Sequence, residues 1–560
     1  MSGHLSRVDR MTDLVPSIGR SSFWMASGTI FSRLLGFIRA ILLAFAIGVT
    51  TDAADAFGVA NQLPNSVYAL IMGGVLNAIL VPQLVKARKM KDDGRGYIDR
   101  FATLALVVFF AIGLIATVAS PLMIGLYTTG WSDSQVALAT AFAYWTIPQL
   151  FFYGLYSVFG EVLNSRSKFG PFMWAPALNN LVAIAGLGVF IWFFGADPEG
   201  TRAITGWDAD QIAVLAGTAT AGVAAQALIL LFFWKKIGLK LSLNFKFKGY
   251  GIGAGLKTAS WSFAMVLISQ IGALVQINVA SSAAEARDQG IVIASVAAAT
   301  IGWLIFMLPH SIVTVSVATA YYTKISTSAS NGDLASMKAD LLQALRLIVI
   351  FMTLATAGMI VLAFPLARVF SPGFEQAEAL AYVIIALAVG LVPFSLVHML
   401  QRAFFALEDT KTPFVFTTVQ VGLHIAAAIT LLNVLEKQWL VVGLSLVTAT
   451  TVLIQLVLAG WLMKSKIDFK PTGLLLNLIR SLIAAAISGV IGYLILEQLG
   501  GVSISGWVLA NQLNAVLGSV AIAAGMVISF LFLVRALRLP EHGIITKFLV
   551  EVTQRNSNRG

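Results

Sequence analysis

The sequence predicts an all-α polytopic membrane protein with 14 transmembrane helices: two six-helix lobes, two further C-terminal helices, and both termini in the cytoplasm. The prediction rests on the composition, on recurring apolar runs and on the charge of the segments between them. Of the 560 residues, 58% are hydrophobic and 11% are charged, whereas a soluble domain carries about 25% charged residues. The mean hydropathy is +0.86, so we expect the chain to lie in a membrane.

Apolar runs long enough to cross a bilayer recur along the whole chain. They are continuous and do not alternate with polar residues, which favours helices over membrane strands. The first run follows a polar segment and is succeeded by many similar runs, so we interpret it as a transmembrane helix and not as a cleaved signal peptide. The predicted spans are 22–48, 57–85, 101–127, 136–163, 172–195, 210–234, 251–283, 290–322, 341–367, 376–401, 413–434, 438–463, 473–497 and 507–534.

The charges between the spans support this topology. With a cytoplasmic N-terminus, the inside segments hold 28 Lys and Arg, and the outside loops hold four. Cytoplasmic loops of membrane proteins carry such an excess, which also accounts for the net charge of +11 without a nucleic-acid partner.

A basic amphipathic segment at 235–250 divides the first twelve spans into six and six. A short charged turn leads to a proline near the start of a span in each half, at Pro171 and Pro413. We therefore predict two lobes of common origin, 22–234 and 251–463, related by an axis along the membrane normal. The helices at 473–534 are additions, and 1–21 and 535–560 are cytoplasmic tails.

Enzymatic and metal-binding patterns are absent from the sequence. It has no cysteine, which excludes disulfides and thiolate metal sites. Its five histidines form no HExxH pattern, and no GxxxxGK[ST] phosphate loop is present. We predict no catalytic residues, no metal site and no enzymatic activity.

Two arginines interrupt the first apolar run, in "SRLLGFIRAILLAF". Arg33 lies about 17 Å into the helix, and Arg39 lies six residues further, roughly 120° around it. An arginine at the centre of a membrane helix costs about 2.5–3.5 kcal/mol or more. This placement favours a role in which the two arginines form the positively charged wall of a water-filled cavity. The alternative is a buried structural ion pair, for which Asp55 is the nearest acid in sequence.

Three other polar residues, Asp55, Asn65 and Glu161, are candidates for lining or gating that cavity. Asn65 follows Pro64 in the second span, where proline frees a backbone carbonyl. Helix–helix hydrogen bonding is the simpler role for any single amide there. Glu161 lies at the end of the fourth span. Two roles remain open for it there: gating of the cavity, and simple solvation of its carboxylate at the membrane surface.

Several segments resemble the MurJ (MviN) family of bacterial lipid II flippases, in the MOP superfamily. They are "SRLLGFIRAILLAFAIG", "DAFGVANQLPN", "ILVPQLVKA", "LNSRSKFGPFMWAPALNN", "LEDTKTPF" and "MLPHSIVTVSVATAYYTKIS". The resemblance covers about residues 22–470 and implies two six-helix lobes with two extra helices. It also implies that Ser32, Arg33 and Arg39 face the central cavity and bind the substrate diphosphate and headgroup, and that Asp55 is the acid of the DAF motif.

The chain departs from the family pattern at several cavity positions. Ala40 stands where an acid normally follows the second arginine, and Tyr68 and Leu304 stand near places that carry arginines. The span 251–283 has no acidic residue for the sodium site proposed for some members. These departures indicate a divergent member, for which an actinobacterial source is one interpretation.

The resemblance implies a multi-pass protein of the bacterial cytoplasmic membrane that flips lipid II by alternating access for cell-wall synthesis. No cofactor is expected. Membrane potential or an ion gradient would supply the energy, and sodium is one candidate ion. We expect a monomer, with cell-wall synthesis or division proteins as candidate partners. Three alternatives remain open: a flippase for another polyprenyl-linked saccharide, a drug or cation antiporter of the same superfamily, and a non-transporting scaffold.

Overall fold

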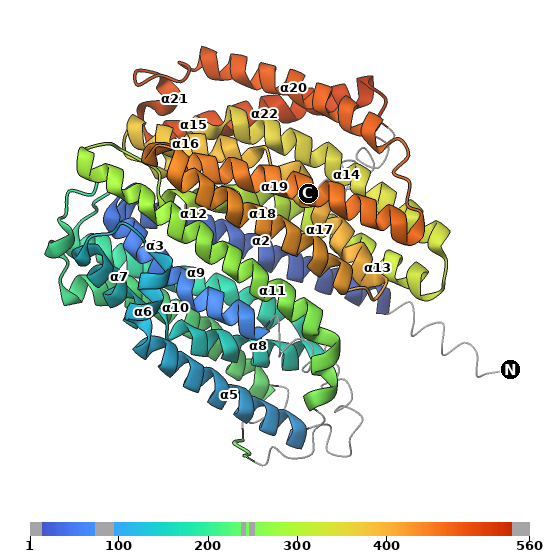
Figure 1. The fold of residues 1–560 in the computed structure, drawn as a ribbon, viewed down its shortest axis with the longest axis horizontal. Coiled ribbons are helices and arrows are strands. Elements are labelled where there is room, and N and C mark those ends of the chain that lie inside the picture. Colours follow the sequence, from blue (N-terminus) through green and yellow to red (C-terminus); the bar gives the residue numbers. More distant parts are fainter. Residues whose placement is uncertain (1–13, 73–94, 167, 237–241, 246–251, 540–560) are drawn as a thin grey trace. The chain divides into compact units, whose positions relative to one another are not determined.

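The computed structural model describes residues 14–72, 95–166, 168–236, 242–245 and 252–539, and these residues form helices and no strand. They divide into two compact units, residues 1–266 and 267–560 (Figure 1). The all-α fold predicted from the sequence is confirmed. Most of the predicted linker 235–250 and most of both tails lie outside the described residues, so these assignments stay predictions.

The helices of the first unit follow the predicted spans in order. Their bounds are α2 Leu14–Ile47, α3 Asp52–Ile71, α5 Arg95–Val118, α6 Ser120–Tyr127, α7 Asp133–Thr146, α8 Gln149–Ser165, α9 Phe169–Phe194 and α10 Ala209–Lys236. The long helix α11, Ile252–Ser281, begins in the first unit and ends in the second.

The second unit continues the same pattern. Its helices are α12 Val296–Pro309, α13 Val315–Ser330, α14 Leu334–Val361, α15 Ala363–Phe370, α16 Phe374–Ala388, α17 Leu391–Ala406, α18 Lys411–Val434, α19 Leu440–Ile467, α20 Leu474–Gln498, α21 Trp507–Ala510 and α22 Gln512–Ala536. Short turns join some of them: η3 Ser282–Gln289 and η5 Lys437–Trp439 are 3₁₀-helices, and η4 His310–Thr314 is a π-helix.

Within the described residues, 12 helices are long and apolar enough to cross a membrane, or up to 13 if α16 and α17 form one bent span. The structure does not describe residues 73–94, so the second half of the predicted span 57–85 lies outside the described residues. The total of 14 and the cytoplasmic location of both termini therefore stay predictions.

Within the described residues, six predicted spans are each broken into two α-helices, usually near a proline. In the span 101–127 the break between α5 and α6 falls at Ala119, just before Pro121. Proline has no N–H to donate to the carbonyl four residues earlier. That carbonyl belongs to Thr117, and the Ser120 hydroxyl donates to it instead at 2.6 Å. Such substitutes allow a helix to bend inside a bilayer. The other five broken spans are 136–163, 290–322, 341–367, 376–401 and 507–534.

A core of aromatic and aliphatic side chains holds the first unit together. It includes Phe109 of α5, Phe159 of α8 and Trp234 of α10, each at most 2% exposed. The Trp234 indole packs edge-on against the Phe159 ring and donates a hydrogen bond to the Phe159 carbonyl at 3.2 Å. The single polar atom of this large side chain is therefore satisfied in the core.

In the second unit, α20 packs against α14 and α22 (Figure 1). Arg368 of α15 is 9% exposed and links α15 to the short helix α21. Its guanidinium donates to the carbonyls of Leu509 at 2.8 Å and Ala510 at 3.2 Å. A buried charge is tolerated there because it completes the hydrogen bonding of the end of α21.

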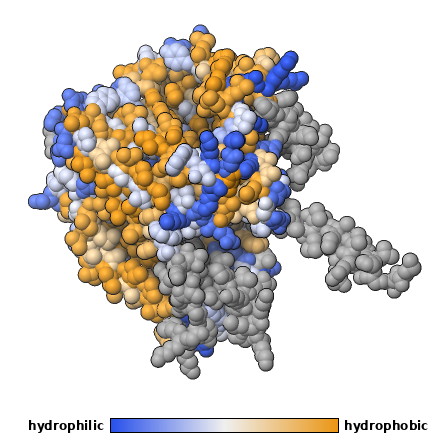
Figure 2. All heavy atoms as spheres, turned by 45° about the vertical axis from the view of Figure 1, so that its right-hand side comes forward, coloured by the Kyte–Doolittle hydropathy of each residue, from blue (hydrophilic) through white to orange (hydrophobic). Residues whose placement is uncertain are grey.

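Much of the surface is apolar, as a lipid-facing protein requires (Figure 2). At the helix ends, contacts within each unit join loops that the charge pattern assigns to the same side of the membrane. The Asp197 N–H, in one predicted outside loop, donates to the Ala46 carbonyl at the predicted outer end of the first span. Lys437 and Glu285, in two other predicted outside loops, form an ion pair at 3.2 Å. These contacts agree with the predicted alternation of loops.

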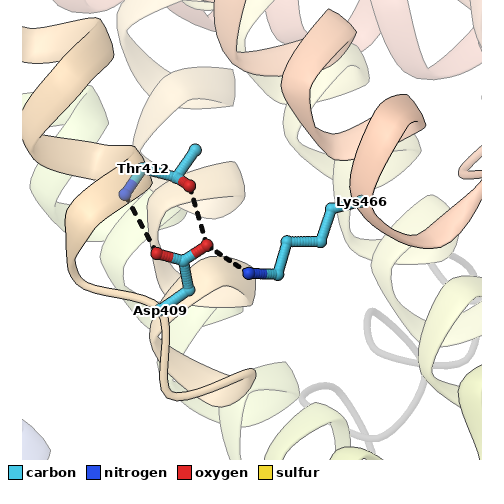
Figure 3. Close-up of polar contacts among 3 residues, drawn as sticks. All are labelled: Asp409, Thr412 and Lys466. Carbon is cyan, nitrogen blue, oxygen red and sulfur yellow. Dashed lines mark hydrogen bonds and ion pairs between the residues drawn. The ribbon is translucent and has the colours of Figure 1, made fainter.

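On the predicted inside, Asp409 joins the loop before α18 to the end of α19 (Figure 3). Its carboxylate accepts hydrogen bonds from the Thr412 amide at 2.9 Å and hydroxyl at 2.7 Å, and it pairs with Lys466 at 2.6 Å. We call these three residues the Asp409 clamp. Burial alone would raise the pKa of Asp409, but Lys466 and Thr412 together hold it below its usual value.

Candidate functional site

The two arginines predicted to line a cavity lie on α2, and both are half-buried. Six residues of helix separate them by about 9 Å along the axis. The charge of Arg39 acts on the hydroxyl of Tyr153, on α8 of the same unit. Arg39 therefore faces a polar group inside the first unit.

Ser32, the third predicted substrate residue, lies in the contact between α2 and α9. The Asn180 side-chain amide donates to the Ser32 carbonyl at 2.8 Å and to its hydroxyl at 3.4 Å. Gly28 and Gly36 lie one turn before and after Ser32. A Cβ at Gly28 would lie 2.7 Å from the Trp174 ring, and one at Gly36 would lie 3.5 Å from Asn180.

This repeat of small residues every fourth position lets two membrane helices approach closely. The contact fixes the rotation of α2 and thereby the direction in which its arginines point. A direct role of Ser32 in substrate binding stays a prediction.

Near Arg39, a row of polar side chains joins α3 to α8 through two hydrogen bonds. The Gln149 amide donates to Asn61 at 3.2 Å, and the Tyr68 and Ser157 hydroxyls share a short hydrogen bond. Between these bonds, Asn65 of α3 lies near Tyr153 of α8. We call this row, together with Arg39 and Glu161, the polar column. Its members are Arg39, Asn61, Asn65, Tyr68, Gln149, Tyr153, Ser157 and Glu161.

The column follows from helix geometry. Gln149, Tyr153, Ser157 and Glu161 recur every fourth residue, so they lie on one face of α8. The Tyr153 hydroxyl also donates to Gln149 at 3.1 Å, one turn back on the same face. Gln149 is 1% exposed and reaches Thr220 of α10 at 3.1 Å, which holds the column against a third helix.

The middle of the column is accessible. Asn65 is exposed, and Tyr153 and Tyr68 are half-buried, with their ring centroids 5.4 Å apart. At this level one guanidinium, two phenol hydroxyls and one amide come together. All are donors that suit phosphate or sugar oxygens.

Glu161 lies at the predicted cytoplasmic end of the column. It is half-buried and lies near enough to Asn164, Tyr68 and Tyr156 to interact with them electrostatically. Eight residues of α8, about 12 Å, separate it from Tyr153. A gating role for Glu161 stays a prediction.

Asp55 lies outside the column. It is fully buried in the first turn of α3, where Thr51 caps the helix by accepting from the Ala54 amide at 3.0 Å. A carboxylate in a first turn is favoured by the positive end of the helix dipole. Ten residues, about 15 Å, separate Asp55 from Asn65, so the structure does not bring these two predicted residues together.

The structure thus brings together Arg39 and Asn65, with Glu161 further along, and adds Tyr153, Gln149 and Ser157, which the sequence analysis missed. The fourfold spacing along α8 was the available signal. Among the described residues, no group of His, Asp and Glu could hold a metal ion. The column offers hydrogen bonds and positive charge, which are suited to binding an anionic polar molecule.

Comparison with known proteins relates the chain to one family. Residues 43–511 match the family model described as lipid II flippase MurJ. A probable lipid II flippase MurJ from Rhizobium tropici is 28% identical over 458 residues, covering 80% of this chain and 79% of the relative. One from Rhizobium meliloti (strain 1021) is 27% identical over 421 residues, covering 73% and 74%.

Solved structures show the same fold. A structure of lipid II flippase MurJ in an inward closed conformation matches with a TM-score of 0.66 at 20% identity, covering 89% of this chain and 98% of that chain. An inward-facing multidrug resistance MATE family transporter of the MOP superfamily matches with a TM-score of 0.57 at 16% identity, covering 77% and 98%.

Proposed function

The chain belongs to the lipid II flippase MurJ family, and from this premise we propose that it flips lipid II across the bacterial cytoplasmic membrane, where it is a multi-pass protein. The single observation that carries the proposal is the match of residues 43–511 to that family. The polar column supports it, because it places a guanidinium and several neutral donors inside a membrane helix bundle.

The physical task explains this chemistry. Lipid II has a diphosphate and a sugar–peptide headgroup that would lose their hydration in hydrocarbon, at a prohibitive free-energy cost. A wetted site lined by donors replaces that hydration. Arg39 would bind phosphate oxygens through its planar fork of N–H groups, and the hydroxyls of Tyr68 and Tyr153 would bind neutral oxygens beside it.

We propose that Tyr68 and Tyr153 take over part of the role of the family arginine missing near position 68. The Tyr68 hydroxyl is held by Ser157, and Tyr153 is held by Gln149. Donors fixed in this way lose little conformational entropy when they bind a ligand. They recognise oxygen atoms without adding another charge to the membrane interior.

Energy for transport would come from the membrane potential or an ion gradient, since one charge moving across 100 mV gains about 2.3 kcal/mol. The polyprenyl tail would remain in lipid, along the surface of α20 and α22. We propose that the protein works as a monomer without catalysing a reaction, and that cytoplasmic loops contact cell-wall synthesis or division proteins.

Reconstitution tests the substrate. The purified chain in vesicles should move lipid II between leaflets and should leave a polyprenyl-linked saccharide that lacks the peptide in place, with empty vesicles as control. Preference for the second lipid would favour the other polyprenyl-saccharide flippase. Transport of small cations and of neither lipid would favour the antiporter.

A further inference from the structure

A pocket of about 540 Å³ lies in the second unit, away from the polar column. It is formed by the loop after η3, the start of α16 and the turn η5 before α19. The charge pattern of the sequence assigns all three segments to the outer side of the membrane. Its volume is in the range of small-molecule binding sites.

Its lining combines acids with aromatic rings. Glu375 and Glu378 come from the first turns of α16, Tyr382 from the next turn, and Trp439 from η5. The Tyr382 and Trp439 ring centroids are 5.6 Å apart, and the planes are inclined by 55°. The Tyr382 hydroxyl donates to Glu378 at 2.8 Å, which fixes that carboxylate beside the rings.

The electrostatics favour a cation. Among the residues that the structure describes, no Lys or Arg lines the pocket. Lys437 is adjacent in sequence to Gln438 of the lining, but its ammonium group pairs with Glu285 at 3.2 Å. Aromatic faces attract cations within about 6 Å, and Glu378 adds a full negative charge at the same place.

Simpler explanations account for single residues and not for their combination. A helix N-terminus favours Glu375 through its dipole, and aromatic residues gather where membranes meet water. Neither effect places two carboxylates and two rings around one cavity. Aliphatic side chains such as Ile291 and Val442 complete the lining, so the pocket suits a cation attached to an apolar body.

We infer that this pocket binds an organic ammonium group, which contacts the Tyr382 and Trp439 rings and pairs with the carboxylates of Glu375 and Glu378. Two sources share this chemistry: a soluble amine, such as a lysine side chain, and the headgroup of an aminophospholipid. The inference goes beyond the proposed function, because it concerns a different unit and requires no movement of lipid II.

Thermal unfolding of the full chain in phosphatidylglycerol nanodiscs tests the inference, because a ligand that binds the folded state raises the Tm. Nα-acetyl-lysine amide is the soluble probe, and its Nε-acetylated form, which lacks the charge, is its control. Phosphatidylethanolamine mixed into the nanodisc is the lipid probe. We expect at least one ammonium probe to raise the Tm and the acetylated form to have no effect. A response to only one probe identifies the source.

Variants locate the effect. Glu378→Gln and Trp439→Ala should each weaken binding of the effective probe by about tenfold. Glu375→Gln changes an exposed residue of the lining and tests the site if Glu378→Gln does not fold. Glu199→Gln removes an exposed acid of the first unit and should bind as the wild type does. Absence of a response to both ammonium probes, or equal binding by the pocket variants and the wild type, would overturn the inference.

Discussion

At the scale of single residues, Arg39 is the feature that most needs an explanation, because a guanidinium in a membrane helix is costly. The structure supplies polar neighbours for it on α8, and Tyr153 is central among them. This side chain interacts electrostatically with Arg39, donates a hydrogen bond to Gln149 and lies near Asn65. Removing its hydroxyl should therefore disturb the column without emptying its volume.

We expect Tyr153→Phe to lower the free energy of unfolding by about 1 kcal/mol, the net value of a typical hydrogen bond. It should also slow lipid II translocation, because Arg39 and Asn65 lose a fixed partner. Tyr144→Phe is the matched control, since Tyr144 is 47% exposed on α7. Both quantities can be measured on purified variants, by thermal unfolding and in vesicles. Equal behaviour of the two variants would contradict a role for the column.

The sequence could predict some of these residues and not others. Arg33 and Arg39 stand out because charge is rare in an apolar run, and the departure at Tyr68 marks a changed cavity position. The fourfold spacing of Gln149, Tyr153, Ser157 and Glu161 indicates a shared face of α8, but it does not show which helix that face contacts. Their role depends on the register between α3 and α8, which only the folded chain sets.

At the scale of helices, hydropathy and loop charge predicted the described spans well. The reason is that every segment in lipid must satisfy its own backbone hydrogen bonds, which a long apolar helix does. The breaks within spans were not predicted. Pro121 and Pro309 are visible in the sequence, but the result depends on the neighbours. Ser120 permits a break before Pro121, whereas a π-turn follows Pro309.

The Asp409 clamp gives an element-scale prediction about pH. The pKa of Asp409 is lowered in the folded state, so its contribution to stability is present above pH ~4, the ordinary range of an aspartate. The contribution is lost as the pH falls through the lowered pKa. We expect Asp409→Asn to cost about 1 kcal/mol at neutral pH and progressively less on acidification, because the wild type loses the same charge.

Unfolding of wild type and Asp409→Asn across a pH series checks this prediction. Asp468→Asn is the control, because Asp468 is 69% exposed and its ion pair is with the equally exposed Lys470 at 3.5 Å. A pH-independent difference between wild type and Asp409→Asn would show that the lost hydrogen bonds, and not the ionised carboxylate, account for the effect.

At the scale of the whole molecule, family membership and the polar column lead us to propose one central claim: the chain flips lipid II, and Arg39 binds its diphosphate. The MATE-like fold alone would also suit an antiporter. An antiporter, however, needs an acid that exchanges protons or sodium ions inside the cavity, and the fully buried Asp55 and the half-buried Glu161 of the first unit lie towards helix ends.

The most direct test is lipid II translocation in bacterial cells depleted of their own lipid II flippase and expressing this chain. We predict that the wild type restores translocation and growth, and that Arg39→Ala restores neither although it reaches the membrane in equal amount. Arg535→Ala, which removes an exposed arginine at the end of α22, should behave as the wild type does. Full translocation by Arg39→Ala, or none by the wild type, would contradict the claim.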